Sequence, residues 1–334
     1  MDEEKSTAAE MKRLPRPQFF ILRRVLLSVL VLLLAGGAGI YLYRENRYTY
    51  VELDTDPGFT LVNSGDIIAS IREGLKEHSP AVRISFYAEG EYMENIADLV
   101  SELMARALAD TGEADEGDWL LYQYGGYTCE YSHLQQDDGY RYTITIKPVY
   151  YMDYEQALET EEEIEAVLES FDLARDASDY EKFIAVYDYI YSNCSYDTVH
   201  QNNDYYKLKC TAYGTLIYGR AVCQGFCVTM YRLLKELGVD CRVVTGQALY
   251  EDGDPEFHSW LIVGLDGLYY NVDITWDIQN QSHTFLLKCD ESFIRHERDE
   301  EFMTEEFLTA YPMAQADYPQ NTYPLSAEET GTGS

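Results

Sequence analysis

Basic residues are scarce in this chain of 334 residues: 25 Lys and Arg stand against 59 Asp and Glu, and the formal net charge is −34. A field of this sign repels phosphate backbones, so we expect no nucleic-acid partner. A solvated acidic surface is the simplest interpretation, and a cationic partner is the alternative. Pro and Gly, at 9 and 22 residues, are too few for a fibrous or low-complexity chain, so we expect one or two folded domains plus tails.

Several signatures are missing from the sequence. There is no internal repeat, which argues against a solenoid or a propeller. There is no Gly-rich phosphate loop, and no close paired ligand spacing supports a zinc site from Cys223, His258 and Asp273. The sequence therefore indicates no cofactor and no metal.

Long uncharged runs are also rare, and the longest extends from Val25 to Tyr43. As a helix it would span about 28 Å, close to the hydrocarbon thickness of a bilayer. A cluster of basic residues shortly before it places the N-terminus in the cytoplasm: Lys12, Arg13, Arg16, Arg23 and Arg24. We predict a cytoplasmic tail over 1–24, a single-pass signal-anchor over 25–43, and an extracytoplasmic remainder at the cell membrane.

Two alternatives for this run stay open. The small residues at 35–38 suit cleavage of a signal peptide, and the protein would then be secreted. A buried helix of a soluble domain is the other.

Seven cysteines are an odd number for an exported protein, so at least one stays unpaired within the chain. Up to three disulfides are compatible with an oxidising exterior, and reduced buried thiols fit the count equally well.

Residues 50–152 alternate between helical and strand patterns. Ser64 can cap a helix whose apolar side chains share one face, and a second amphipathic segment extends to about Asp110. Runs rich in Tyr, Thr and Ile, broken at Gly125-Gly126 and Asp138-Gly139, predict strands over 82–87, 119–124, 127–133 and 140–151. We predict a small α+β domain that serves as a scaffold or as a partner-binding module.

Residues 155–311 form the second predicted domain. Helical patterns cover about 155–173 and 180–194, and a strand is expected at 241–245. The residues from Pro312 onward mix Pro, Asn, Glu, Gly and Ser without periodicity. They predict a flexible acidic tail over 312–334.

Cys223 lies where a nucleophilic thiol is favoured. The run 221–226 leads into an amphipathic helix that Gly238 closes, so Cys223 falls in its first turn. There the unpaired backbone N–H groups and the helix dipole stabilise a thiolate, and the N–H of Cys223 can stabilise an oxyanion. The second oxyanion donor is not placed, and Tyr213 and Gln224 are candidates.

A predicted hairpin brings a base to this thiol. Two apolar runs, 257–264 and 268–276, flank the turn signal Asp266-Gly267. If these two residues form the loop, His258 and Asp273 become diagonal neighbours on one face, and the other face is apolar. A slip by one residue would separate them. For His283 and His296, no strand register that can be derived from the sequence places a carboxylate beside the imidazole.

Three blocks carry a resemblance to a known family. Ala-Val-Cys-Gln-Gly-Phe at 221–226, His-Ser-Trp at 258–260 and Tyr-Asn-Val-Asp-Ile-Thr-Trp-Asp at 270–277 resemble the core blocks of the transglutaminase-like superfamily. Supporting similarity extends from about Tyr180 to His296, with a strand expected at 285–287. Animal transglutaminases usually have Trp soon after the nucleophile and calcium-binding insertions, whereas the Gln-Gly after Cys223 is closer to the bacterial protease-like branch. Calcium-dependent crosslinking is therefore not indicated.

The resemblance implies a papain-like α+β fold, with the nucleophile helix packed on an antiparallel sheet and Cys223, His258 and Asp273 as a catalytic triad. It implies a thiol enzyme that acts on amide bonds of peptides, proteins or cell-wall peptides by hydrolysis or acyl transfer. For Cys223 alone, a disulfide or an inert buried thiol is the alternative. A zinc site built from the three residues lacks the usual spacing. A catalytically idle surface module that binds a partner is the alternative function.

Overall fold

The computed structural model describes residues 48–55, 61–62, 64–88, 96–136, 139–250 and 253–319. Apart from Tyr48, they belong to one compact unit, Thr49–Ser334. The predicted cytoplasmic tail and the predicted membrane segment over 25–43 lie outside the described residues. Within the described part of the chain, no helix is long and apolar enough to cross a membrane.

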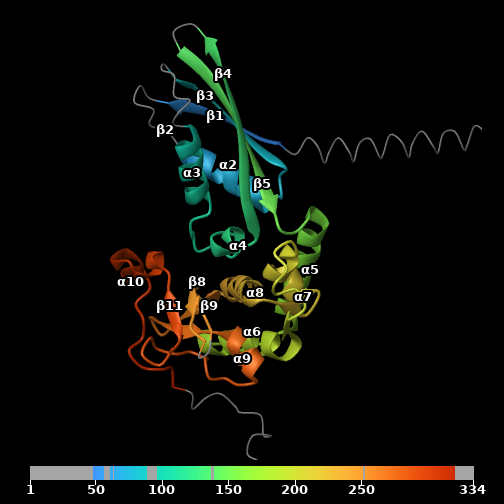
Figure 1. Cartoon of the computed structure of the whole chain (residues 1–334), viewed down its shortest axis with the longest axis vertical. Helices are drawn as coiled ribbons and strands as arrows, with labels where there is room; N and C mark the ends of the chain where they lie inside the picture. The colour runs from blue at the N-terminus through green and yellow to red at the C-terminus, as the bar shows by residue number, and fades with distance from the viewer. Residues whose placement is uncertain are drawn as a thin grey trace, which may run out of the picture. The chain divides into compact units, whose positions relative to one another are not determined.

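The first half of the described chain is an α+β arrangement, as predicted. Its five-stranded sheet has the order β2-β1-β3-β5-β4, and helices α2 and α3 lie against it (Figure 1). Alternate residues of β5, among them Tyr142, Ile144 and Ile146, are buried in the shared core. The elements are β1 (Tyr48–Thr55), β2 (Leu61–Val62), α2 (Ser64–Lys76), β3 (Ala81–Ala88), α3 (Ile96–Ala107), α4 (Asp118–Leu121), β4 (Tyr124–Gln136) and β5 (Gly139–Tyr150).

The strand predicted over 119–124 is wrong, because its first residues form the short helix α4. The buried Asp118 carboxylate accepts hydrogen bonds from the Arg242 side chain and from the Val243 backbone N–H. Trp119 packs into the core of the second half of the chain. These long-range contacts override the local β propensity of the segment. Gly125 and Gly126 do not end a strand, since β4 passes through them with a register shift against β5.

The second half contains the predicted helical segments and a smaller sheet. Helices α5 and α6 each begin with a capping box, Asp153 with Gln156 and Ser178 with Glu181. The elements are α5 (Tyr154–Ser170), α6 (Asp179–Asn193), β6 (Ser195–Tyr196), η2 (Lys207–Cys210), α7 (Ala212–Leu216), β7 (Arg220–Ala221), α8 (Cys223–Glu236), β8 (Cys241–Ala248), β9 (Glu256–Leu265), β10 (Leu268–Val272), α9 (Ile274–Asn280), β11 (His296–Arg298), η3 (Glu300–Met303) and α10 (Glu305–Ala310).

The predicted packing of the nucleophile helix on an antiparallel sheet is confirmed. The sheet has the order β10-β9-β8-β11, and each pair of neighbours is antiparallel. One face packs against α8, with Leu261 and Val263 of β9 in the same core as Phe226 and Met230. The other face carries an aromatic cluster of Trp260, Trp276, Phe285, Phe293 and Phe302. The sheet therefore lies between the helix that bears Cys223 and a layer of aromatic rings.

Two predicted strands near the C-terminus are wrong. The strand expected to run to residue 276 ends at Val272, and α9 follows directly. Residues 285–287 form no strand, and the neighbouring Lys288 makes only an isolated bridge to Asn271.

Residues 312–319 are packed rather than forming the predicted tail. Ala314 is buried, and its backbone N–H donates to the carbonyl of Tyr269. The Tyr318 ring stacks on Tyr180 at 5.1 Å between centroids. Burial of apolar surface holds this segment, which its composition did not indicate. The remainder of the predicted tail, from residue 320, lies outside the described residues.

Candidate functional site

Cys223 is the first residue of α8, as predicted. Val222 precedes the helix without a side-chain cap, so no side chain occupies the first-turn N–H groups near the thiol, of which the Gly225 N–H donates to the Val222 carbonyl. Gly225 permits the helix to start here, because a Cβ at this position would lie 2.7 Å from the Cβ of Ala221 and 2.8 Å from the carbonyl oxygen of Lys209. Cys223 itself is only partly buried. Cys223 therefore lies at a helix N-terminus, and the residue as a whole is partly exposed.

The predicted register of the hairpin is confirmed. Leu265 opposes Leu268, and Asp266 and Gly267 form the loop with φ of 54° and 81°. Asp273 does lie beside His258, but as the N-cap residue of α9 rather than as a strand residue. This difference matters, because the backbone N–H groups at the start of α9 also hold the Asp273 carboxylate in place.

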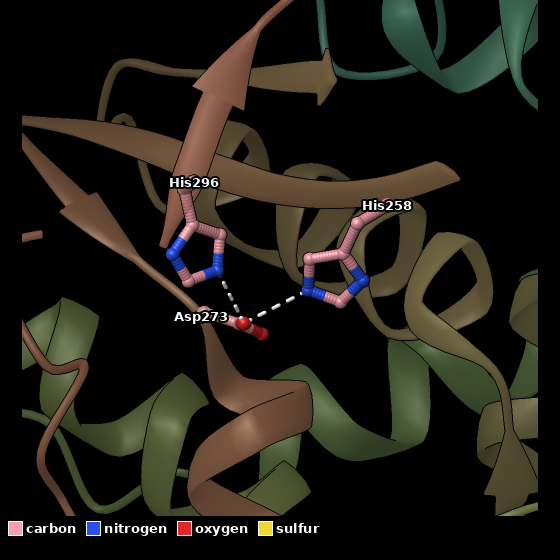
Figure 2. Close-up of side chains that lie close together, drawn as sticks. All are labelled: His258, Asp273 and His296. Carbon is pink, nitrogen blue, oxygen red and sulfur yellow. Dashed lines mark hydrogen bonds and ion pairs between the residues drawn. The ribbon is translucent and has the colours of Figure 1, made fainter. Parts of the chain in front are cut away.

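Both oxygens of the Asp273 carboxylate are used. Oδ1 accepts the backbone N–H groups of Thr275 at 3.0 Å and Trp276 at 3.1 Å. Oδ2 lies 2.8 Å from Nε2 of His258 (Figure 2). Because Nε2 donates to Asp273, Nδ1 is the His258 nitrogen that remains to accept a proton from Cys223.

The electrostatics favour a charged thiol–imidazole pair. Burial disfavours the charged form of each group, but the hydrogen bond and charge of His258 lower the pKa of Cys223 below that of an ordinary thiol. Against the same burial penalty, Asp273 and then Cys223 raise the pKa of His258 well above its usual value. His258 and then His296 hold the pKa of Asp273 below its usual value, again against burial. The directions agree with a thiolate, an imidazolium and a carboxylate held together.

Ser259 is a further neighbour of the thiol. Its hydroxyl is buried and has no hydrogen-bond partner of ordinary geometry within the described residues. Its side chain and its backbone N–H both lower the pKa of Cys223. An O–H donor that faces a sulfur stabilises the thiolate. The His-Ser-Trp block marks this residue in the sequence, although its role is visible only in the structure.

His296 also reaches Asp273, which the sequence did not predict. Its Nε2 atom lies 3.0 Å from Oδ2, so the two imidazoles share one carboxylate oxygen (Figure 2). The side chain is fully buried. His296 starts β11, which joins the sheet beside β8 with His296 opposite Ala248. No local pattern indicates a pairing between segments so far apart in the chain.

The other residues discussed from the sequence have different surroundings. The Tyr213 hydroxyl donates to Glu159 at 3.0 Å, and the Gln224 amide donates to the carbonyl of Tyr122, so neither is placed as a second oxyanion donor. His283 contacts the Tyr187 hydroxyl through Nδ1. All seven cysteines are free thiols, and Cys227 is buried within α8.

Three side chains could in principle hold a metal ion. His258, Asp273 and His296 offer ligand atoms within 4.8 Å of one another, and they form such a group within the described residues. Cys223 is not part of the group, so the zinc site considered from the sequence does not form with that set.

Residues 170–274 match the transglutaminase-like superfamily. Among curated proteins, none matches the chain.

Similar solved structures include a TGase, with 18% identity over 58% of this chain and 51% of that chain at a TM-score of 0.32. A candidate cysteine protease from Cytophaga hutchinsonii has 16% identity over 46% of this chain and 65% of that chain, at a TM-score of 0.28. A candidate protease from Parabacteroides distasonis has 10% identity over 58% and 43%, at a TM-score of 0.22. The chain therefore spans less than two thirds of the length of each, and the family match rather than these scores carries the assignment. Residues 170–274 belong to the transglutaminase-like superfamily.

Proposed function

We propose that the chain is a thiol enzyme that acts on amide bonds of peptides or proteins through a covalent intermediate on Cys223. One observation carries the proposal: Nε2 of His258 lies on Asp273, and the hydrogen bond and charge of the same imidazole lower the pKa of a thiol at a helix N-terminus, Cys223. A merely structural cysteine has no need of this arrangement. Cys227, four residues further along α8, has a pKa raised well above the usual value, chiefly by burial.

The reaction follows from these positions. The Cys223 thiolate attacks the amide carbonyl, a carbon–sulfur bond forms, and the backbone N–H of Cys223 stabilises the negative oxygen. The His258 imidazolium then gives its proton to the leaving nitrogen as the carbon–nitrogen bond breaks. His258 next takes a proton from water or from an acceptor amine, which attacks the thioester and releases Cys223. Asp273 holds the tautomer and orientation of His258 throughout.

The substrate class in this proposal is a peptide, a protein or a cell-wall peptide. We further propose that residues 25–43 anchor the chain in the cell membrane and that the thiol domain acts on the extracytoplasmic side. The basic residues before that segment support this orientation. Protease accessibility in intact cells tests it: digestion from outside should remove the thiol domain. A domain that becomes accessible only after lysis would contradict the orientation.

Selective alkylation tests the thiol. The chain is treated with a limiting amount of iodoacetamide at about pH 6, where ordinary thiols are almost fully protonated, and the labelled peptides are mapped. We expect Cys223 to react before the other six cysteines and faster than a free model thiol. Cys210 is the matched internal control, because it is also partly exposed while burial raises its pKa to about 11. Equal labelling of Cys210 and Cys223 would contradict an activated nucleophile.

A peptide-hydrolysis assay distinguishes the proposed enzyme from the alternative, a surface module that only binds a partner. Release of product from a glutamine- or amide-containing peptide should be lost in Cys223→Ala and strongly reduced in His258→Ala, by about 10²–10⁴-fold for loss of the base. If Cys223→Ala retained every effect of the wild-type protein, the surface module would be the function.

A further inference from the structure

The side chain of His296 is buried, is not used by the proposed triad, and points at the same carboxylate oxygen as His258 (Figure 2). Nε2 of His258 lies 2.8 Å from Oδ2 of Asp273, and Nε2 of His296 lies 3.0 Å from it. These three atoms all lie within 4.8 Å of one another. Two imidazoles and one carboxylate therefore converge on one small volume behind the nucleophile.

The other ring nitrogen of His296 already has a partner. Nδ1 lies 3.0 Å from the carbonyl oxygen of Ile294, and a carbonyl oxygen only accepts hydrogen bonds. Nδ1 is therefore the nitrogen that carries the proton, and in the neutral ring the lone pair of Nε2 faces Asp273. A histidine that binds a metal ion is commonly held in this way, with its other N–H donating to a backbone carbonyl.

The carboxylate of Asp273 is oriented in a similar manner. Oδ1 accepts the backbone N–H groups of Thr275 and Trp276, so Oδ2 is the oxygen presented to the two rings. Beside the neutral ring of His296, lone pairs on Nε2 and Oδ2 face each other across 3.0 Å, which is unfavourable for buried groups. A metal cation bound between these atoms removes the conflict and uses the orientation that the backbone contacts impose.

The donor atoms select the class of ion. Imidazole nitrogens suit zinc and similar transition metals, whereas Ca²⁺ and Mg²⁺ prefer oxygen ligands. Two histidines and one carboxylate, with water in the fourth position, form a known type of zinc site. Metal–ligand distances of about 2.0–2.1 Å place the ligand atoms of a tetrahedral site about 3.3 Å apart. The contacts of His258 and His296 with Oδ2 of Asp273 need to lengthen only slightly to reach this spacing.

A cavity connects this group to the surface. It has a volume of about 310 Å³, and its lining includes His296, Glu297 and Met303. Met303 is 54% exposed and Glu297 is also exposed, so the cavity reaches solvent. The Glu297 carboxylate and the negative net charge of the chain attract cations to it. Because the side chains of His296 and Asp273 are fully buried, we expect the ion to enter and leave slowly.

The position of His296 depends on a close approach of two strands. Gly246 of β8 lies opposite Arg298 of β11. A Cβ on Gly246 would lie 2.0 Å from the carbonyl oxygen of Glu297. The glycine lets β11 come near enough to bring His296 onto Asp273.

We infer that His258, Asp273 and His296 bind one divalent ion of the zinc class, and that the bound ion switches off the thiol enzyme. Only the second part rests on the proposed function. In the active arrangement Nε2 of His258 donates its N–H to Asp273, so the ion can bind this nitrogen only after that proton has left to solvent. The ion and the catalytic arrangement of His258 therefore exclude each other.

The bound ion separates two properties of Cys223. His258 then keeps one proton, on Nδ1, and giving that proton to the leaving nitrogen would leave an anionic ring on the metal. Cleavage of the amide therefore loses its general acid. Alkylation by iodoacetamide needs no proton donor, because iodide leaves without one. Since Cys223 is not one of the three ligands, its thiolate stays free to react.

Binding of Zn²⁺ to the metal-free full chain tests the site. After prolonged incubation at neutral pH, we expect the ring ¹⁵N signals of His258 and His296 to move, to return with a chelator, and to ignore Ca²⁺ and Mg²⁺. Calorimetry should show binding weakened by about 100-fold or more in His296→Gln and unchanged in Cys223→Ala. His133→Gln, in the other sheet, is the control and should bind as the wild type does. Ring signals that stay in place in the wild type, or equal binding by His296→Gln, would overturn the inference.

Two measurements on Cys223 test the switch: peptide hydrolysis and iodoacetamide labelling, each with and without Zn²⁺. We expect Zn²⁺ to abolish hydrolysis while labelling of Cys223 continues, and a chelator to restore hydrolysis. His296→Gln, compared with itself, should hydrolyse equally well in both conditions. Loss of labelling would place the ion on the thiol and overturn the inference, as would undiminished hydrolysis by the zinc-bound wild type. A wild type that binds Zn²⁺ as expected but hydrolyses no peptide without it would refute the proposed function and support the metal site.

Discussion

The carboxylate of Asp273 accepts a hydrogen bond from Nε2 of His258 at 2.8 Å while its other oxygen caps helix α9. One side chain thus orients the imidazole and starts a helix. The two roles can be separated by experiment, because loss of a cap reduces stability and loss of the carboxylate charge reduces reactivity.

Replacement of Asp273 by Asn should reduce amide hydrolysis by about 10²–10⁴-fold, because an amide group favours the wrong tautomer of His258 and does not stabilise its imidazolium. Steady-state rates measure this effect, and urea unfolding should show a loss of only about 1 kcal/mol. Asp153→Asn is the matched control, since Asp153 also caps a helix but touches no histidine in its capping box. Comparable rates for the two variants would contradict the role of Asp273.

Replacement of Ser259 by Ala should raise the pKa of Cys223, because the thiolate loses a nearby O–H donor. The lower limb of the alkylation profile should move to higher pH by about half a unit to one unit. Thr275→Val provides a comparison, because its hydroxyl is also buried without a partner among the described residues but is not among the main causes of the Cys223 shift. If the lower limb of the pH profile moved equally in both variants, the effect would come from a general disturbance of packing around Cys223 and not from loss of the Ser259 hydroxyl.

Asp277 should make the protein less stable as the pH rises. Burial raises the pKa of this carboxyl to about 7, although Phe285 N–H and the Tyr187 hydroxyl donate to it. Since the folded-state pKa lies above the unfolded value of 3.8, the stabilising contribution is complete below about pH 4 and is lost as the pH rises through 7. The total change is on the order of 4 kcal/mol as an upper value.

Urea unfolding at a series of pH values measures this dependence, and Asp277→Asn should flatten the curve between about pH 4 and pH 7. Asn keeps an acceptor for the Phe285 N–H and a donor for Tyr187, so the variant should still fold. An unchanged slope in the variant would assign the dependence to other groups.

A methyl group at position 225 should disturb the nucleophile without touching it. In Gly225→Ala the new Cβ meets Ala221 and the carbonyl of Lys209, so the first turn of α8 must move. We expect a loss of about 1–3 kcal/mol in the free energy of unfolding and a slower alkylation of Cys223. Gln224→Ala changes the preceding residue without this overlap. Full reactivity in Gly225→Ala would show that the start of α8 tolerates displacement.

The parts of the site that short-range patterns specify could be predicted. The Asp266-Gly267 turn fixes the register of β9 and β10, because both residues adopt the positive φ that a two-residue hairpin requires. The position of Cys223 follows from the apolar periodicity of α8 and its end at Gly238. Each signal involves residues close in sequence, so no knowledge of the tertiary fold is needed.

The remainder depended on long-range contacts. Asp273 ends the strand because its carboxylate caps α9, and a run of apolar residues does not reveal that competition. Asp118 becomes helical through Arg242, more than a hundred residues away in the chain. His296 reaches the Asp273 carboxylate through the pairing of β11 with β8, and no sequence pattern near residue 296 predicts this pairing. In each case the partner is distant, and local propensity gives the wrong answer or none.

Gly246 of β8 lets β11 pack closely, because a Cβ at this position would meet the carbonyl oxygen of Glu297. This close packing bears on which substitutions would be expected to inactivate the protein. A change there alters neither a reacting atom nor any of the three motif blocks, yet it would force β11 outward and move His296 away from Asp273. Such a variant would keep an intact nucleophile and an intact hairpin, while Asp273 would lose its contact with His296. A mutational screen confined to the recognisable motifs would therefore underestimate how many positions inactivate the protein.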